Sequence, residues 1–151
     1  MTHPERTKPV HVPGDGPPQI DRPSPEILEA LGEDGVFRML ADLYAKLEET
    51  ELRPWFPDDM AEASKRSAAF FVQLLGGPPL FSQQYGPPRM RMRHLPYEID
   101  ESARRVWLGS FEAVLEAAEE RYGFPPEHLE GFRAFLDGFS GWMVNVAPDS
   151  P

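Results

Sequence analysis

Apolar residues recur at the spacing of an amphipathic helix along most of this chain. Stripes that follow the i, i+3, i+4 spacing predict helices, because that spacing places side chains on one face. No segment shows the alternation of apolar and polar residues that is typical of a strand. Long helices are expected over about residues 33–49, 59–75, 100–121 and 126–146. The pattern therefore predicts an all-α fold in which about four long helices pack in pairs.

The first residues of the chain follow a different pattern. Residues 1 to about 25 are rich in proline and glycine and have no apolar periodicity, which predicts a disordered leader. Ser24 followed by Pro25 is a typical helix start, and a short helix is expected to begin there and to end at Gly32. We therefore expect residues 26–148 to form a single domain behind the leader.

A basic segment separates the second and third long helices. A Gly-Gly-Pro-Pro run at 76–79 ends the earlier helix, and a long loop is expected after it. An Arg-Met-Arg-Met-Arg run at 89–93 then leads to His94, on a short helical turn that Pro96 ends. The alternating arginines form either a solvated strip or a receptor for carboxylates or phosphates.

Composition excludes several classes of function. None of the 151 residues is cysteine, which excludes disulfides, thiolate metal sites and iron–sulfur clusters. The formal net charge of −10 disfavours nucleic acids and anionic membranes as partners, because both are polyanions. No apolar run is long enough for a transmembrane helix, and the first residues lack the apolar core of a signal peptide. The chain is therefore expected to be cytoplasmic.

His94 is the candidate for metal chemistry. A structural zinc site needs four nitrogen or sulfur ligands, which a lone imidazole cannot supply. A single histidine can, however, be the protein ligand of a haem iron. The alternative is a structural histidine held by hydrogen bonds.

Several motifs together resemble one family over about residues 26–148. The run 89–94 lies at a characteristic distance from Gly-Gly-Pro and from the tryptophan that follows, and this spacing is the most specific feature. The chain resembles the group II, or O-type, truncated haemoglobins, which are two-on-two globins. The resemblance implies a two-over-two helical sandwich around one haem b. The matching motifs are Leu43-Tyr44, the runs 52–57, 70–78, 81–84 and 89–94, Trp107, and the run 143–146.

The same resemblance implies roles for individual residues. His94 would bind the iron through Nε2, while a backbone carbonyl in the turn holds its other ring nitrogen. Tyr44 would be the main hydrogen-bond donor to the bound gas, and the Trp107 indole a second donor; the alternative is that both are core residues. The Ser67 hydroxyl would donate to the ligand or to water, or return its proton to a helix carbonyl.

The remaining implied contacts surround the porphyrin. Phe56, where many relatives have tyrosine, packs on the ring but cannot donate a hydrogen bond. Ala63 is too small to close the entrance, and Phe70 lies on the inward helix face. Arg66 and Arg93 are candidates for pairing with the haem propionates, or are solvent-facing charges.

Two functions remain open on these residues. One is a haem protein that binds oxygen and other diatomic gases, including NO and CO, for capture, transport or sensing. The other is a haem enzyme that removes nitric oxide with the help of a reductase or has peroxidase-like activity, although the lack of a distal histidine disfavours an efficient peroxidase. A haem-free helical adaptor is a third hypothesis, against which the three residues His94, Tyr44 and Trp107 argue. The protein is expected to be a monomer or a homodimer.

Overall fold

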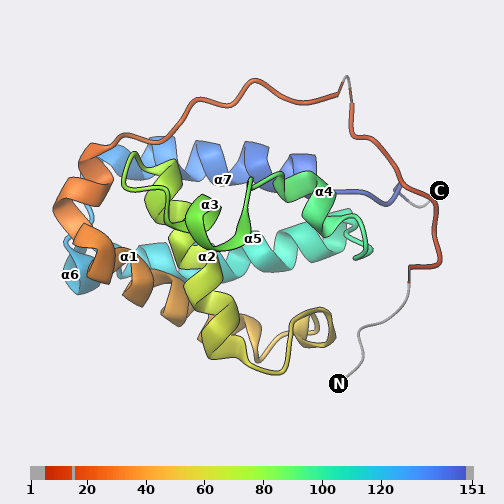
Figure 1. Ribbon diagram of the computed structural model, residues 1–151, viewed down its shortest axis with the longest axis horizontal. Helices are drawn as coiled ribbons and strands as arrows, with labels where there is room; N and C mark the ends of the chain where they lie inside the picture. Colours follow the sequence, from red (N-terminus) through yellow and green to blue (C-terminus); the bar gives the residue numbers. More distant parts are fainter. Residues whose placement is uncertain (1–5, 15, 149–151) are drawn as a thin grey trace.

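The computed structural model describes residues 6–14 and 16–148, and helices dominate this part of the chain (Figure 1). No strand occurs among the described residues, so the all-α prediction is confirmed. None of the helices described here is long and apolar enough to cross a membrane. In chain order the elements are α1 (Glu26–Leu47), η1 (Arg53–Trp55), α2 (Met60–Leu74), α3 (Leu80–Tyr85), α4 (Met90–His94), α5 (Glu101–Glu116), α6 (Ala118–Tyr122), η2 (Pro126–His128) and α7 (Leu129–Met143).

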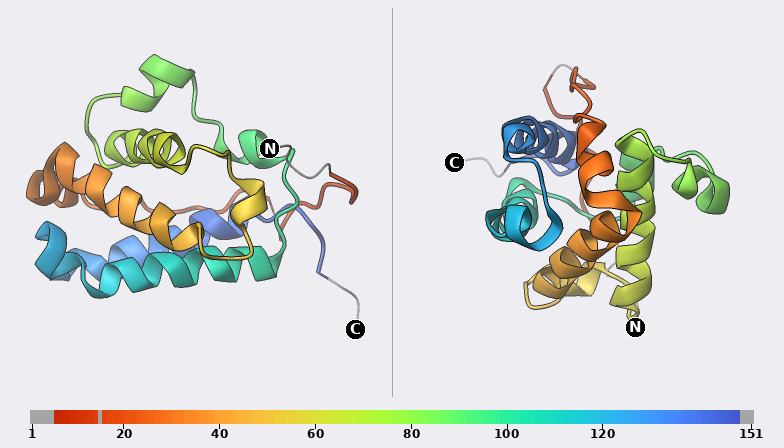
Figure 2. Two further views of the ribbon diagram at one scale, coloured as in Figure 1. Left: turned by 90° about the horizontal axis from the view of Figure 1, so that it is seen from below. Right: turned by 90° about the vertical axis from the view of Figure 1, so that its left-hand side faces the viewer.

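The long helices pack in two pairs. α1 packs against α2, and α5 packs against α7, so that two helical layers face each other (Figure 2). Aromatic side chains join the layers: the Phe71 ring of α2 lies 5.8 Å from that of Phe111 in α5 and 6.1 Å from that of Phe132 in α7, between ring centroids. Burial of such large apolar side chains is the main favourable term that holds the two layers together.

Glycine and aspartate set the boundaries of the first two long helices as the sequence predicts. Gly32 has φ +70° and ψ 169°, so it divides α1 into a short and a long arm. A side chain would be strained at this backbone conformation, which glycine adopts readily. Asp59 precedes α2, and its Oδ1 accepts a hydrogen bond of 3.0 Å from the Glu62 amide. This cap satisfies one of the free amides at the helix start.

The expected loop before the basic run contains a helix that the sequence reading missed. Residues Leu80–Tyr85 form α3, which is too short to show a clear apolar stripe. Tertiary contacts hold it: the Gln73 side chain donates to Ser82 Oγ at 2.8 Å and accepts from the Ser82 amide at 3.0 Å. The Phe81 side chain is buried beneath it.

The last two long helices are shorter than predicted. A break at Ala117 separates α5 from α6, and at the far end of α6 the Tyr122 hydroxyl donates a hydrogen bond to the Asp42 carboxylate of α1. α7 ends at Met143, and Val144 leaves helical geometry with ψ 126°. The residues that follow pair with the loop before α5, since the amides of Asn145 and Val146 both donate to the Ile99 carbonyl.

The leader lies along α7 (Figure 1). Its described residues form no helix or strand, as its composition suggests, yet they make specific contacts with the helical body. Ile20 packs on Gly138 of α7, where an added Cβ would meet the Ile20 side chain at 3.0 Å, and the His11 amide donates to the Asn145 carbonyl at 2.9 Å. Its disorder and its division from the domain at residue 26 remain predictions.

Candidate functional site

The short helix α4 presents His94 at its last position. Arg89, in the left-handed region with φ +40°, begins the turn, and the His94 Nδ1 lies 2.6 Å from the Met90 carbonyl oxygen one turn earlier. A carbonyl only accepts, so Nδ1 carries the hydrogen and donates it. In the neutral ring the lone pair then resides on Nε2. The backbone carbonyl expected in the turn is present, and it leaves Nε2 as the nitrogen able to bind a metal.

The charge state of His94 supports the same chemistry. Burial lowers the pKa of the His94 imidazole below its ordinary value, and the bond to the Met90 carbonyl offsets only part of this shift. The ring is therefore neutral near pH 7, as a metal ligand must be.

Tyr44, Ser67 and Phe56 form a second group, which α1, α2 and the turn between them supply. The rings of Tyr44 and Phe56 meet edge to face with centroids 5.5 Å apart. Burial raises the pKa of the Tyr44 phenol, while a hydrogen bond with Ser67 and the charge of Arg66 lower it in part. The phenol stays protonated, and its own hydrogen can be donated to another group.

Helix α2 has two different faces. Ser64, Ala68, Phe71 and Val72 are buried against the rest of the protein. Of the residues predicted to face inward, Phe71 is buried, whereas Ala63, Ser67, Phe70 and Leu74 are only half-buried. Phe70 continues this face toward α3 and α7, with its ring 6.1 Å from Phe81 and 5.7 Å from Phe139. The second face is largely apolar, includes the small residues Ala63 and Ser67, and is incompletely covered by protein.

Trp107 occupies a comparable half-buried position on α5, with its ring edge-on to Phe111 at 5.4 Å. Within the described part of the chain, no hydrogen bond or ring contact joins His94 or Trp107 to Tyr44 or Ser67. The structure thus brings Tyr44, Ser67 and Phe56 together. His94 on α4 and Trp107 on α5 contact other residues, Tyr97 and Phe111.

The side chains of Arg66, from α2, and Arg93, from α4, both lie against aromatic rings of α3. The Arg66 guanidinium sits 5.0 Å from the centroid of Tyr85, and that of Arg93 sits 4.9 Å from the centroid of Phe81. Arg93 also donates to the carbonyls of Tyr85, Pro87 and Pro88 at 2.6–2.8 Å. Both side chains are exposed, and Arg93 in addition fixes the loop that leads into α4.

The sequence reading missed the role of Arg91. Instead of forming a solvated strip, its guanidinium lies 4.5 Å from the Trp142 centroid and donates to the carbonyls of Trp142 and Val144 at 2.6 and 2.9 Å. Burial, and then the nearby charge of Arg6, lower the pKa of Arg91. The alternation of arginine with methionine indicates that one side of this short segment faces the protein. The pattern could not predict that Arg91 would bind α7.

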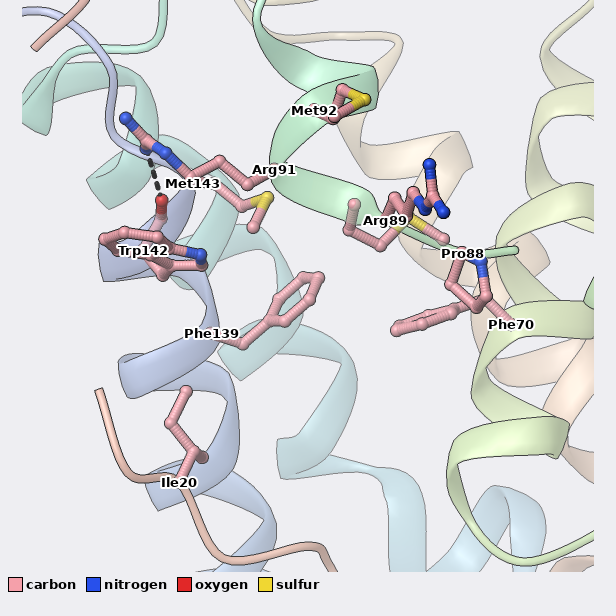
Figure 3. Close-up of a pocket in the computed structure, with 10 residues that line it drawn as sticks. Ile20, Phe70, Pro88, Arg89, Arg91, Met92, Phe139, Trp142 and Met143 are labelled. Atoms are coloured by element: carbon pink, nitrogen blue, oxygen red, sulfur yellow. Dashed lines mark hydrogen bonds between the residues drawn. The ribbon is translucent and has the colours of Figure 1, made fainter. Parts of the chain in front are cut away.

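A cavity of about 340 Å³ lies behind α4, between α2 and α7 (Figure 3). Its walls are mainly apolar and include Phe70, Met90, Phe139 and Met143, and the leader contributes Ile20. Figure 3 shows Arg91 passing over Trp142 at one side of this space. The cavity means that α4 rests on the helical body through a limited set of contacts.

Comparison with known proteins identifies relatives of this architecture. A family model described as bacterial-like globin matches residues 26–141. The group 2 truncated hemoglobin YjbI of Bacillus subtilis is 33% identical over 118 residues, which cover 78% of this chain and 86% of that protein. Among solved structures, the group II truncated hemoglobin of Bacillus anthracis superposes with a TM-score of 0.74 at 29% identity, over 84% of this chain and 95% of that one. The truncated oxygen-avid haemoglobin of Bacillus subtilis gives a TM-score of 0.70 at 31% identity, over 81% and 99%.

Proposed function

Because this chain belongs to the bacterial-like globin family, and within it to the group II truncated haemoglobins, we propose that it binds haem b through His94 and holds oxygen tightly. Globins carry haem, and when bound it supplies an iron with a coordination position for a diatomic gas. The oxygen-avid relative of known structure supports tight binding by analogy. The single observation that carries the tight-binding function is the Tyr44 phenol, which burial keeps protonated and therefore able to donate a hydrogen bond.

The residues around His94 fit this cofactor. The Met90 carbonyl fixes the ring tautomer that leaves Nε2 free to bind iron, and burial keeps the ring neutral. The half-buried face of α2, with Ala63 and Phe70, together with Phe56, offers an apolar surface for one side of the porphyrin. In our proposal, the flat ring accounts for the absence of direct contact between the Tyr44 and His94 groups.

Tyr44 and Trp107 supply the hydrogen-bond donors. Burial raises the pKa of the Tyr44 phenol, so its hydroxyl keeps the hydrogen that it would donate to the gas. The indole N–H of Trp107 can only donate. A hydrogen bond to an acceptor that carries charge contributes about 1.5–3 kcal/mol, so each donor slows gas release by roughly tenfold or more. Slow release suits capture, sensing or chemistry better than delivery.

Arg66 and Arg93 provide positive charge for the propionates. Both guanidiniums lie on the aromatic rings of α3, so packing restricts their motion before a carboxylate arrives. Arginine pairs with carboxylates through two parallel hydrogen bonds. We propose that they anchor the cofactor at its solvent-facing edge.

Oxygen-dependent removal of nitric oxide is the second candidate. The protonated phenol of Tyr44 favours it, because retained oxygen is the reactant that meets nitric oxide. Nitric oxide and oxygen form nitrate when one electron is supplied, so the proposal requires a reductase as partner. Ala63 and Ser67 on the α2 face offer no efficient acid–base group, which disfavours a peroxidase.

The test is the rate of oxygen release from the loaded protein, measured by stopped flow. Tyr44→Phe is expected to release oxygen at least about tenfold faster, as one lost donor predicts, and Trp107→Phe is expected to change the rate in the same direction. Tyr122→Phe makes the matched substitution on α6 and is expected to leave the rate unchanged. If neither site variant releases oxygen faster than wild type, these residues do not retain the gas.

A further inference from the structure

Asn145 lies directly after α7 and connects three segments of the chain. Its side chain is fully buried. The Nδ2 donates to the His94 carbonyl at 3.1 Å, and the Oδ1 accepts from the Ile99 amide at 3.0 Å. Since a carbonyl only accepts and an amide N–H only donates, these two neighbours fix the orientation of the Asn145 side chain. Asn145 therefore holds the end of α4 and the start of the segment that leads into α5.

Arg6 of the leader completes this connection. Its Nη1 donates to Asn145 Oδ1 at 2.7 Å and to the carbonyls of Leu95 and Tyr97 at 3.0 and 3.1 Å. Its Nη2 donates to the Asn145 carbonyl at 2.6 Å. One guanidinium thus binds the first residues after His94 and the residue that holds the His94 carbonyl.

Further contacts fasten the leader on either side of Arg6. The Thr7 amide donates to Glu98 Oε1 at 2.6 Å. The His11 carbonyl accepts from Arg91 Nη2 at 2.7 Å, so the leader also contacts a side chain of α4 directly. Ile20 lines the cavity behind α4 and packs on Gly138 of α7 (Figure 3).

Helix α4 depends on such outside contacts for its position. It has only five residues and no side-chain cap, and so short a helix is not stable by itself. The bond from His94 Nδ1 to the Met90 carbonyl lies inside α4. A shift of α4 therefore carries the imidazole ring with it.

We propose that the leader is a strap that sets the position of His94, with Arg6 and Asn145 as its positioning residues. Neither residue touches the cofactor; both act through the backbone after His94. The proposal rests on the proposed role of His94 as the haem ligand. The family model matches residues 26–141, so Arg6 and the rest of the leader lie outside the residues that it matches.

The experiment uses the full chain with three substitutions. Arg6→Ala removes the guanidinium from a segment without helix or strand, so the helical core is left intact. Asn145→Asp keeps the acceptor for Arg6 and for the Ile99 amide but replaces the donor to the His94 carbonyl by an oxygen. Arg22→Ala removes an exposed arginine of the same leader and is the matched control.

Two measurements report on the strap. The iron–imidazole stretching band in the resonance Raman spectrum of the loaded ferrous protein reports the bond to His94, and Arg6→Ala and Asn145→Asp are expected to shift or broaden it. Hydrogen exchange in the cofactor-free protein is the second. In Arg6→Ala the amides of Tyr97 and Ile99 are expected to exchange about tenfold faster, the factor that one lost hydrogen bond of a charged donor corresponds to. Arg22→Ala is expected to match wild type in both.

The outcomes separate this proposal from the proposed function. If wild type shows no iron–imidazole band, or if His94→Ala retains it, the role of His94 is wrong and the strap no longer positions a ligand. If wild type shows the band and Arg6→Ala leaves both the band and the exchange rates unchanged, the strap is wrong while the proposed function stands. If Asn145→Asp fails to fold, the measurements on Arg6→Ala alone determine whether the leader positions His94.

Discussion

The Nδ1 of His94 and the carbonyl oxygen of Met90 lie 2.6 Å apart within a single turn of α4. This contact leaves the Nε2 lone pair as the reactive atom of the ring, whatever binds there. It also ties the orientation of the imidazole to the backbone of α4, so that residues far along the chain can influence the ring.

The depressed pKa of His94 predicts a dependence of stability on pH. Because burial lowers this pKa below the ordinary value of 6.5, the unfolded chain binds more protons than the folded chain as the pH falls through that value. Stability from the neutral ring is therefore fully present above about pH 6.5 and declines below it. Urea unfolding of the cofactor-free protein from pH 5 to 8 is expected to show this decline in wild type and a smaller one in His94→Gln. Equal pH dependence of the two proteins would contradict the assignment.

Ser67 is predicted to act through Tyr44. Ser67→Ala removes the hydroxyl that interacts with the Tyr44 phenol, which is expected to let the Tyr44 hydroxyl rotate and to weaken its bond to the gas. Loss of one neutral hydrogen bond corresponds to about 1 kcal/mol, so oxygen release is expected to be roughly fivefold faster. Ser64→Ala is the control on the same helix, because the Ser64 hydroxyl donates to the Ala61 carbonyl on the buried face. Equal release rates in the two variants would show that Ser67 does not orient the phenol.

Much of the fold followed from the sequence. Gly32 and Asp59 act locally, through backbone freedom and through a cap, so the pattern alone predicted the ends they define. α3 could not be predicted, because Gln73 on another helix holds it. The break at Ala117 likewise accompanies a contact between Asp42 and Tyr122, which are far apart in the chain.

In the candidate site, too, local contacts could be predicted from the sequence and contacts between distant segments could not. The His94 turn and its carbonyl acceptor are local and were expected, whereas the bond between Ser67 and Tyr44 was not, since it joins two helices. Arg91 and Arg6 were overlooked because most of their hydrogen-bond partners are backbone carbonyls, which have no sequence signature. The proline and glycine content of the leader predicted disorder, so contacts between Arg6 and the helical body were not expected.

Arg93 is expected to contribute to cofactor retention in two ways. Arg93→Ala removes a candidate propionate partner and releases the carbonyls of Tyr85, Pro87 and Pro88. Transfer of haem to an apo-globin acceptor is expected to be about tenfold faster, as loss of one charge-assisted bond predicts. Arg93→Lys is expected to restore only part of the retention, because an ammonium cannot reproduce the planar contacts.

Arg105→Ala provides the control for this prediction. Arg105 is an exposed arginine of α5 that pairs with Glu101 at 3.6 Å, and its loss is expected to leave haem transfer unchanged. Equal transfer rates in Arg93→Ala and Arg105→Ala would rule out a role for Arg93 in retention.

Titration of the cofactor-free protein with hemin, followed by its visible spectrum, tests the role of His94 most directly. Wild type is expected to take up hemin with a sharp Soret band, and its ferrous CO form to show the spectrum of an iron bound by neutral imidazole. His94→Ala is expected to lose that spectrum, while His128→Ala, which removes the histidine paired with Glu26, keeps it. A wild-type protein that stays colourless, or a His94→Ala protein with an unchanged spectrum, would contradict the account.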